Sequence, residues 1–186
     1  MARKIIVGVA VAAVAGFALV WAASPIFAAR ALISAAKAGD TRGIEQRVDF
    51  PSLRASLKDE LNDELIARMR RDPRVVESGL GGLGMMLAPM LLSGAVDTLV
   101  TPEVVANMVT TAEAPDPTKP GDPNPVDEHD GNDIHQSWGY RSLNEFAVTL
   151  TDRDRPDDHL ALILERRGLF EWKLAAVDLQ SAPPEA

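Results

Sequence analysis

The stretch "VDFPSLRASLK" at residues 48–58 contains the start of a long amphipathic helix. Asp49 suits the N-cap position, because its carboxylate can accept a hydrogen bond from a backbone N–H of the first turn. Pro51 fits in that turn, where the N–H groups have no partner within the helix. Val48 and Leu53 occupy the two positions of a hydrophobic staple, which sets how the chain enters a helix. The stretch therefore predicts a helix start rather than a site.

Leucines spaced by four residues continue from this start. The spacing predicts one apolar side on a helix of roughly twenty residues, which ends before Asp72-Pro73. The apolar series is Leu53, Leu57, Leu61, Leu65 and Met69. Arg54, Ser56 and Lys58 have no role in the helix start, and a solvated helix face accounts for them. Arg54 and Lys58 are also bases four residues apart, so a site for an anionic group is the alternative.

The N-terminal segment has the length and composition of a membrane anchor. Residues 5–23 contain no charge and would form a helix about 28 Å long, close to the thickness of the bilayer hydrocarbon. Arg3 and Lys4 place the N-terminus in the cytoplasm. We therefore predict a single-pass protein of a bacterial inner membrane with its domain in the periplasm. The alternative is a signal peptide cleaved near Ala22 and secretion to the periplasm, although such peptides usually have a shorter apolar region of about 7–15 residues.

The composition excludes several classes of function. Acidic residues outnumber basic ones, 27 against 19, so the chain offers no basic surface for nucleic acid phosphates. The absence of cysteine excludes disulfides, thiolate catalysis and cysteine-ligated zinc. A length of 186 residues suggests one domain with an appendage.

Composition also divides the chain into segments. The anchor at 1–29 is followed by a helical part at 30–112, a disordered acidic and proline-rich loop at 113–137, an antiparallel sheet at 138–180 and a tail at 181–186. Pro25 is expected to open a helix that ends at Gly39. Asp40 is expected to cap the next helix along the chain. Thr101 is expected to cap a helix that begins at Pro102, after the one that starts at Asp49.

Three stretches near the C-terminus alternate apolar and polar residues as strands do. They are "LNEFAVTLT" (143–151), "HLALILERR" (159–167) and "FEWKLAAVDL" (170–179). The third changes phase at Ala175-Ala176, which predicts a β-bulge there. Strands this close in sequence form an antiparallel meander, so the predicted fold class is α+β, with helices packed on a C-terminal antiparallel sheet.

The order of several segments resembles a known family. The segments are the apolar anchor ending in Ser24-Pro25, then "AAKAGD", "VDFPSLRASLK", "LVTPE", "YRSLNEFAVTL" and "LERRGLFEWKLAAVDL". Together they resemble the bacterial domain-of-unknown-function family 2939, whose members look like short membrane-anchored proteins. The resemblance implies the anchor and the architecture but no activity, substrate or site residue. More loosely, helices before a meander are similar to the cone-shaped nuclear-transport-factor-2-like fold, which often leaves a pocket.

Residues 79–100 form a second apolar stretch, rich in glycine and methionine. A buried core helix is the favoured interpretation, because residues 85–96 are too few for a membrane span. In the alternative interpretation, Met85, Met86 and Met90 form an adaptable apolar lid over a cavity.

The spacing of polar residues indicates no catalytic, metal or cofactor site. The histidines of the acidic loop match no zinc spacing, and the loop lacks the ligands of a calcium-binding loop. His159, next to Asp157 and Asp158, is a candidate general base, with a polar strand end as the alternative. Trp138 and Trp172 could line an aromatic pocket, although tryptophan in a small sheet is usually part of the core.

We therefore expect a membrane-anchored envelope protein with a non-enzymatic binding or interaction domain that needs no cofactor. Its partner would be an envelope protein or a small apolar ligand. The alternatives are an enzyme that uses His159 and a lipid-binding protein with a pocket between helices and sheet. The candidate binding residues are Arg54, Lys58, Met85, Met86, Met90, Trp138, His159 and Trp172.

Overall fold

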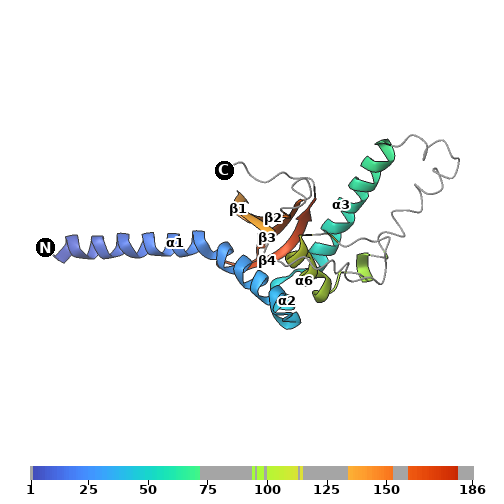
Figure 1. Ribbon diagram of the computed structural model, residues 1–186. Helices are drawn as coiled ribbons and strands as arrows, with labels where there is room; N and C mark the ends of the chain where they lie inside the picture. The colour runs from blue at the N-terminus through green and yellow to red at the C-terminus, as the bar shows by residue number, and fades with distance from the viewer. Residues whose placement is uncertain are drawn as a thin grey trace.

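α1 (Ala2–Lys37) is one continuous helix that projects from the rest of the molecule and also runs into it (Figure 1). The computed structural model describes residues 2–71, 94, 96–98, 100–112, 114, 134–152 and 159–179. The other elements are α2 (Thr41–Arg47), α3 (Phe50–Arg71), α6 (Pro102–Thr111), β1 (Ile134–Ser142), β2 (Glu145–Asp152), β3 (His159–Arg166) and β4 (Trp172–Asp178). Helices followed by an antiparallel sheet confirm the α+β class. The likeness to the cone-shaped fold stays a prediction.

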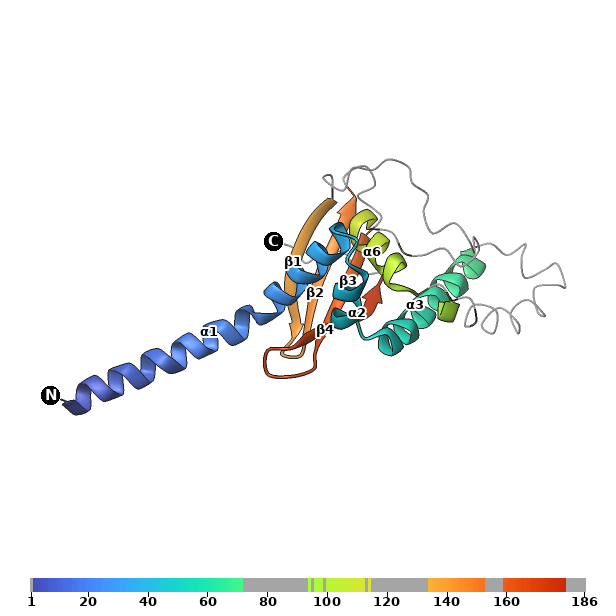
Figure 2. The same cartoon turned by 90° about the horizontal axis from the view of Figure 1, so that it is seen from below.

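The four strands form an antiparallel meander in chain order. The end of α1, α2, the start of α3 and α6 pack on one face of this sheet (Figure 2). Alternate strand residues point to that face and share one core with the helices. The largest fully buried side chains of this core are Leu32, Ile44, Leu53, Leu57, Met108, Leu150, Leu160, Leu162, Leu164 and Leu174.

The sheet has one strand more than the sequence pattern predicted. β1 begins at Ile134, so the last four residues of the predicted loop at 113–137 belong to a strand. Ile134 and Trp138 both pack against the core, and their even spacing was the available signal. The polar residues between them obscured it. The bulge in β4 is confirmed, because Ile163 pairs with Ala176 and Leu164 with Leu174, which leaves Ala175 unmatched.

The three predicted helix caps are confirmed. The backbone N–H of Ser52 donates to Asp49 Oδ1 at 3.3 Å, which caps α3. Asp40 accepts from the backbone N–H of Gly43 at 3.0 Å at the start of α2, and Thr101 accepts from that of Val104 at the start of α6. Each of these bonds joins residues three apart, so the information that specifies it is local.

Pro25 lies inside α1 and does not open a helix, contrary to the sequence prediction. A proline within a helix leaves the carbonyl four residues earlier without its usual donor. Here that carbonyl belongs to Trp21, and the Ser24 hydroxyl donates to it at 2.7 Å. The serine thus supplies the hydrogen bond that Pro25 cannot make, and the helix continues.

The predicted boundary between anchor and domain, at residue 29, therefore falls within a helix. Ser24 and Ala29 are 7% and 0% exposed, so both belong to the buried part of the domain. A fragment that begins at residue 30 would lose these contacts. We expect a stable domain fragment to need residues 24–29 as well.

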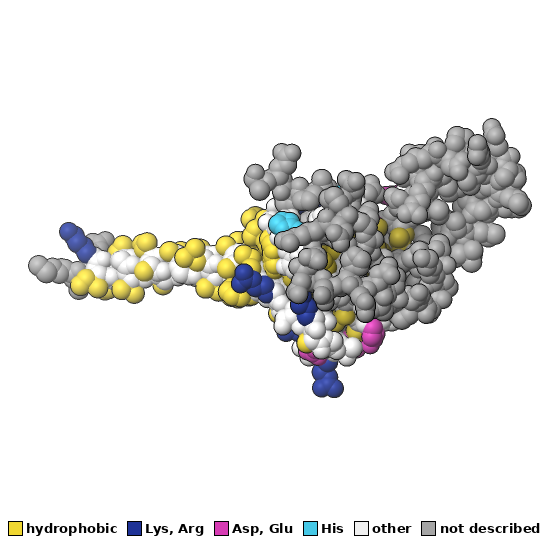
Figure 3. All heavy atoms as spheres, viewed as in Figure 1, with side chains coloured by type: hydrophobic (Ala, Val, Ile, Leu, Met, Phe, Trp, Pro, Cys, Tyr) yellow, Lys and Arg dark blue, Asp and Glu magenta, His cyan; other side chains and the backbone are white. Residues whose placement is uncertain are grey.

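By length and composition, α1 is the one helix of the described residues that could cross a membrane, although a signal sequence near an N-terminus meets the same criterion. Its large apolar side chains from Ile5 to Val20 are 51–71% exposed. Figure 3 shows hydrophobic side chains along the projecting helix up to the point where it meets the domain. Such a surface is unfavourable in water and favourable in hydrocarbon, so α1 is compatible with anchoring in a membrane.

Candidate functional site

Five residues connect α1 to the sheet, and we call them the junction: Trp21, Ser24, Tyr140, Arg166 and Trp172. The indole N–H of Trp172 donates to Ser24 Oγ at 2.8 Å in a buried position. The Tyr140 hydroxyl donates to the carbonyl oxygen of Ala22 at 2.8 Å. The middle of α1, where the helix enters the domain, is thus hydrogen-bonded to two strands.

Arg166 completes the junction. The central carbon of its guanidinium lies 4.1 Å from the ring centroid of Trp21 and 4.2 Å from that of Trp172. A cation placed between two indole rings is favourable, because each ring face is electron-rich. The same guanidinium donates to the carbonyl oxygens of Leu143 at 3.1 Å and Leu169 at 2.9 Å. Arg166 therefore ties α1 to the turns on both sides of the sheet end, without a flexible linker between helix and domain.

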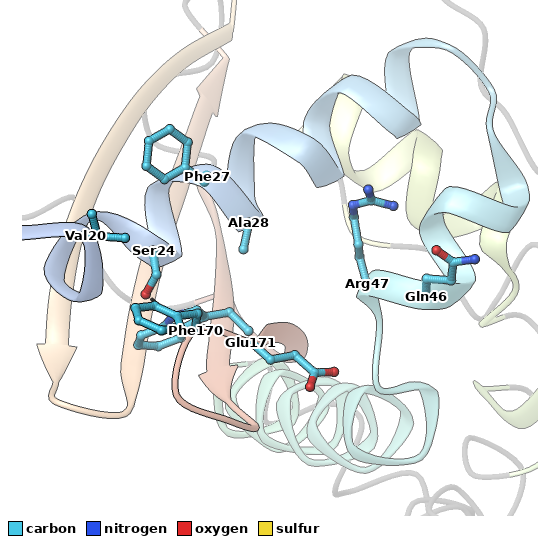
Figure 4. A pocket seen from close by; sticks show the side chains of 9 residues that line it. Val20, Ser24, Phe27, Ala28, Gln46, Arg47, Phe170 and Glu171 are labelled. Atoms are coloured by element: carbon cyan, nitrogen blue, oxygen red, sulfur yellow. Dashed lines mark hydrogen bonds between the residues drawn. The ribbon is translucent and has the colours of Figure 1, made fainter. Parts of the chain in front are cut away.

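A cleft of about 520 Å³ lies beside the junction, between α1, α2 and the turn that precedes β4. Its apolar lining comes from Val20, Phe27, Ala28, Phe170 and Trp172, and its polar lining from Ser24, Gln46, Arg47 and Glu171. In Figure 4, Phe27 extends from one side of α1 and Phe170 lies on its other side, next to Ser24, while Arg47 and Gln46 lie on α2 across the cleft.

The polar groups of the cleft retain capacity for a ligand. Arg47 uses Nη1 to donate to the carbonyl oxygen of Gly43 at 2.7 Å, which holds the side chain in place. A guanidinium has five N–H donors, so further donors can face a ligand. The Glu171 side chain is 62% exposed and lies 3.9 Å from Lys173 Nζ. An apolar wall with separated basic and acidic groups suits an amphiphilic molecule better than a purely polar one.

Of the candidate binding residues predicted from sequence, Trp172 lines this cleft. Trp138 is partly buried against the core, and its ring lies 6.3 Å from that of Phe146. Met85, Met86 and Met90 lie outside the described residues. The predicted binding roles of all these residues stay predictions.

The polar residues of the opening stretch have structural partners. Arg54 donates to the carbonyl oxygen of Val100 at 2.9 Å, and Lys58 pairs with Asp97 at 2.7 Å. Ser56 Oγ both donates to the carbonyl oxygen of Val177 and accepts from its N–H, at 3.1 and 3.0 Å. The interpretation as a merely solvated face is therefore wrong for Arg54 and Ser56, whereas the Lys58–Asp97 pair is exposed.

His159 begins β3, at the end of that strand opposite to Arg166, about 23 Å away at the usual rise of a strand. Its ring Nε2 is buried and has no hydrogen-bond partner among the described residues. The residues that line the cleft do not include it. Asp157 and Asp158, its proposed carboxylate partners, lie outside the described residues. Among the residues that are described, no group of three or more histidines and carboxylates could hold a metal ion.

Sequence reasoning missed Ser24, Arg47 and Arg166. By sequence alone, Arg166 is an ordinary charged residue near a turn, and Trp21 is one more apolar residue of the N-terminal segment. The one local signal was the Ser24-Pro25 pair within an apolar helix, because a hydroxyl next to proline can replace the missing hydrogen bond. The junction contacts between α1 and the sheet join residues more than a hundred positions apart, and local patterns do not predict them.

A pH effect is expected from Glu60 on α3. Burial raises the pKa of this carboxyl, and the nearby carboxylates of Asp178 and Asp63 act in the same direction. The hydrogen bond from the N–H of Leu179 opposes the rise in pKa without cancelling it.

Because the folded pKa is raised, the folded state binds this proton more tightly than the unfolded state. Its contribution to stability is present below the ordinary glutamate pKa and is lost as pH rises through the raised value. Glu60→Gln should therefore raise the melting temperature more at pH 7 than at pH 4, with the exposed Glu45→Gln as control. An equal effect at both pH values would contradict this assignment.

A family model described as "Protein of unknown function (DUF2939)" matches residues 14–108, which is slightly more than half of the chain. The match includes "VDFPSLRASLK" and "LVTPE" and ends within α6, before the sheet. No curated protein and no solved structure matches the chain.

Proposed function

The chain belongs to the DUF2939 family, and from this premise we propose that it is a single-pass membrane protein whose periplasmic domain binds an amphiphilic ligand next to the bilayer. The observation that carries the proposal is the cleft at the junction. Its lining combines residues of the anchor helix, such as Val20, with polar residues of the domain, such as Arg47. A ligand in this cleft would contact membrane and domain together.

The anchor is supported by the apolar surface of α1. Lys4 lies just before this surface, and Arg30 follows it close to the domain. Arg3 and Lys4 directly precede the apolar segment, and basic residues directly before a span favour a cytoplasmic N-terminus. In a bacterial inner membrane this orientation gives a periplasmic domain.

The binding role is supported by the chemistry of the cleft. Phe27 and Phe170 offer apolar surface for an acyl chain or a similar group, while Arg47 can donate to an anionic head group. A ligand that enters from the bilayer would leave its apolar part near Val20 and its polar part near α2. The role is one of binding rather than catalysis. If the domain instead binds an envelope protein, that protein would contact the surface of the domain and the cleft would hold no ligand.

Membrane orientation can be tested with single cysteines, because the natural chain has none. Glu45→Cys on α2 should react with a membrane-impermeant maleimide added to cells whose outer membrane alone has been permeabilised. The chain should also remain in the membrane pellet after carbonate extraction. A soluble chain, or a Glu45→Cys label that requires lysis of the inner membrane, would overturn the proposed location.

Ligand binding can be tested with palmitic acid that carries a photoactivatable diazirine on its chain. In vesicles containing the full-length protein, we expect crosslinks at two places. Those at residues 46–47 of α2 report a ligand in the cleft, and those along the anchor report contact with bulk lipid. Ala28→Trp should fill the cleft and lower the yield at residues 46–47 about tenfold, the factor that corresponds to about 1.4 kcal/mol. Ser34→Trp, at an exposed position of the same helix, is the matched control. Crosslinks confined to the anchor, or unchanged by Ala28→Trp, would overturn the binding role.

A further inference from the structure

The turns at the junction end of the sheet present apolar side chains to solvent. Leu143, between β1 and β2, is 72% exposed, and Leu169 and Phe170, before β4, are 58% and 43% exposed. We call these three residues the apolar tips. Single exposed leucines are common on soluble proteins and need no explanation. Here, however, both turns are held side by side, because Arg166 donates to the carbonyl oxygens of Leu143 and Leu169.

One of these turns lies beside the apolar part of α1. The ring of Phe170 lies edge-on to that of Phe17, with centroids 5.5 Å apart and an interplanar angle of 73°. Phe17 belongs to the apolar segment at residues 5–23 and lies about 9 Å from residue 23 along the helix axis. Ser24 is buried in the domain, so the part of α1 available to the bilayer ends there; residues 5–23 are only about as long as the hydrocarbon is thick, and the helix has little freedom to slide. A membrane that surrounds the segment therefore also reaches Phe170.

The charges around the tips fit a shallow insertion. The guanidinium of Arg166 is covered by the rings of Trp21 and Trp172 and hydrogen-bonded to backbone carbonyls, as suits an arginine at a membrane interface. Glu145 and Glu171 are exposed and lie within two residues of the tips. Burying these carboxylates in hydrocarbon would be costly. The turns can enter the interfacial layer but no further.

We propose that the apolar tips insert into the interfacial layer of the same bilayer that α1 spans. The domain then contacts the membrane at three points: through α1, through the turn with Leu143, and through the turn with Leu169 and Phe170. The inference rests on the proposed anchoring of α1 and goes beyond it. The occupant is the bilayer rather than a protein, because the surface is continuous with the apolar surface of α1 through the Phe17–Phe170 contact. Contact at three points holds the domain in one orientation and keeps the mouth of the cleft at the lipid surface.

The test uses single cysteines in the otherwise cysteine-free full-length chain. Nitroxide labels at Leu143→Cys and Leu169→Cys report on the tips, Val14→Cys on the anchor, and Glu45→Cys on an exposed position of α2. The protein is reconstituted into vesicles of phosphatidylethanolamine and phosphatidylglycerol. Collision of each label with oxygen, which concentrates in lipid, is compared with collision with a water-soluble nickel chelate.

Labels at 14, 143 and 169 should favour oxygen, and the label at 45 should favour the nickel chelate by several fold. If the label at 14 favours oxygen while the labels at 143 and 169 behave like the label at 45, the proposed anchoring is supported and insertion of the tips is wrong. If 14 itself favours the chelate, the proposed anchoring fails. Protection of 143 and 169 from both reagents, with spin–spin broadening between chains, would show that a second copy covers the tips and would also overturn the proposal.

Discussion

Replacing Trp172 by alanine is expected to lower the free energy of unfolding by about 3–5 kcal/mol, the usual range for a buried tryptophan. The side chain is only 3% exposed and belongs to the main core. Its removal would leave a cavity, open the space beside the Arg166 guanidinium and delete the hydrogen bond to Ser24. Denaturant unfolding of the full-length protein in detergent, followed by circular dichroism, measures this loss.

Trp172→Phe separates the two contributions of this residue. The phenyl ring retains most of the apolar contact, while the indole N–H and its bond to Ser24 are lost, which typically costs about 1 kcal/mol. We therefore expect the phenylalanine variant to be considerably more stable than the alanine variant. A loss below 1 kcal/mol in Trp172→Ala would show that the junction does not hold α1 on the sheet.

Replacing Leu57 by alanine is expected to cost about 2–5 kcal/mol, because the side chain is fully buried and the helix cannot collapse into the space that it leaves. Leu57 lies one turn after Leu53, where the start of α3 packs on the sheet. The N–H of Asp49 donates to the carbonyl oxygen of Leu174 at 2.8 Å and holds this start in place. The same unfolding experiment measures the effect.

Leu61→Ala is the matched control for Leu57→Ala. Leu61 continues the same leucine spacing but is only partly buried against the core. Its substitution should cost less than half as much, because less apolar surface is lost from the interior. Equal effects at the two positions would mean that the leucine spacing alone, and not the contact of the helix start with β4, determines the stability of α3.

The helix starts and the bulge in β4 were predictable because their causes are local. A cap joins a side chain to a backbone N–H three residues later, as at Asp49, and a bulge appears as a change of phase within a few residues, as at Ala175. The prediction that Pro25 opens a helix was wrong, although the cause is also local. The rule that proline breaks a helix omits the hydroxyl of Ser24, which restores the missing hydrogen bond.

The candidate site was much less predictable. Trp172 was recognised as a possible pocket residue because it is aromatic, but Arg47 and Arg166 looked like ordinary surface charges. What distinguishes Arg166 is its place between Trp21 and Trp172, and nothing in the residues next to it indicates this neighbourhood. The same is true of Ser56, which makes two hydrogen bonds to Val177, a residue 121 positions away in the chain.

By itself, the sequence determined the apolar helix that could span a membrane, the arrangement of helices before an antiparallel sheet, and the buried leucines at the start of α3. These properties follow from composition, periodicity and capping, which act over a few residues. Only the tertiary structure decided that the apolar helix continues into the domain, that Arg166 joins it to both turns, and that a cleft lies beside this junction. Those features depend on contacts between distant segments, such as Ser24 with Trp172, 148 positions apart, and such contacts exist only once the chain has folded.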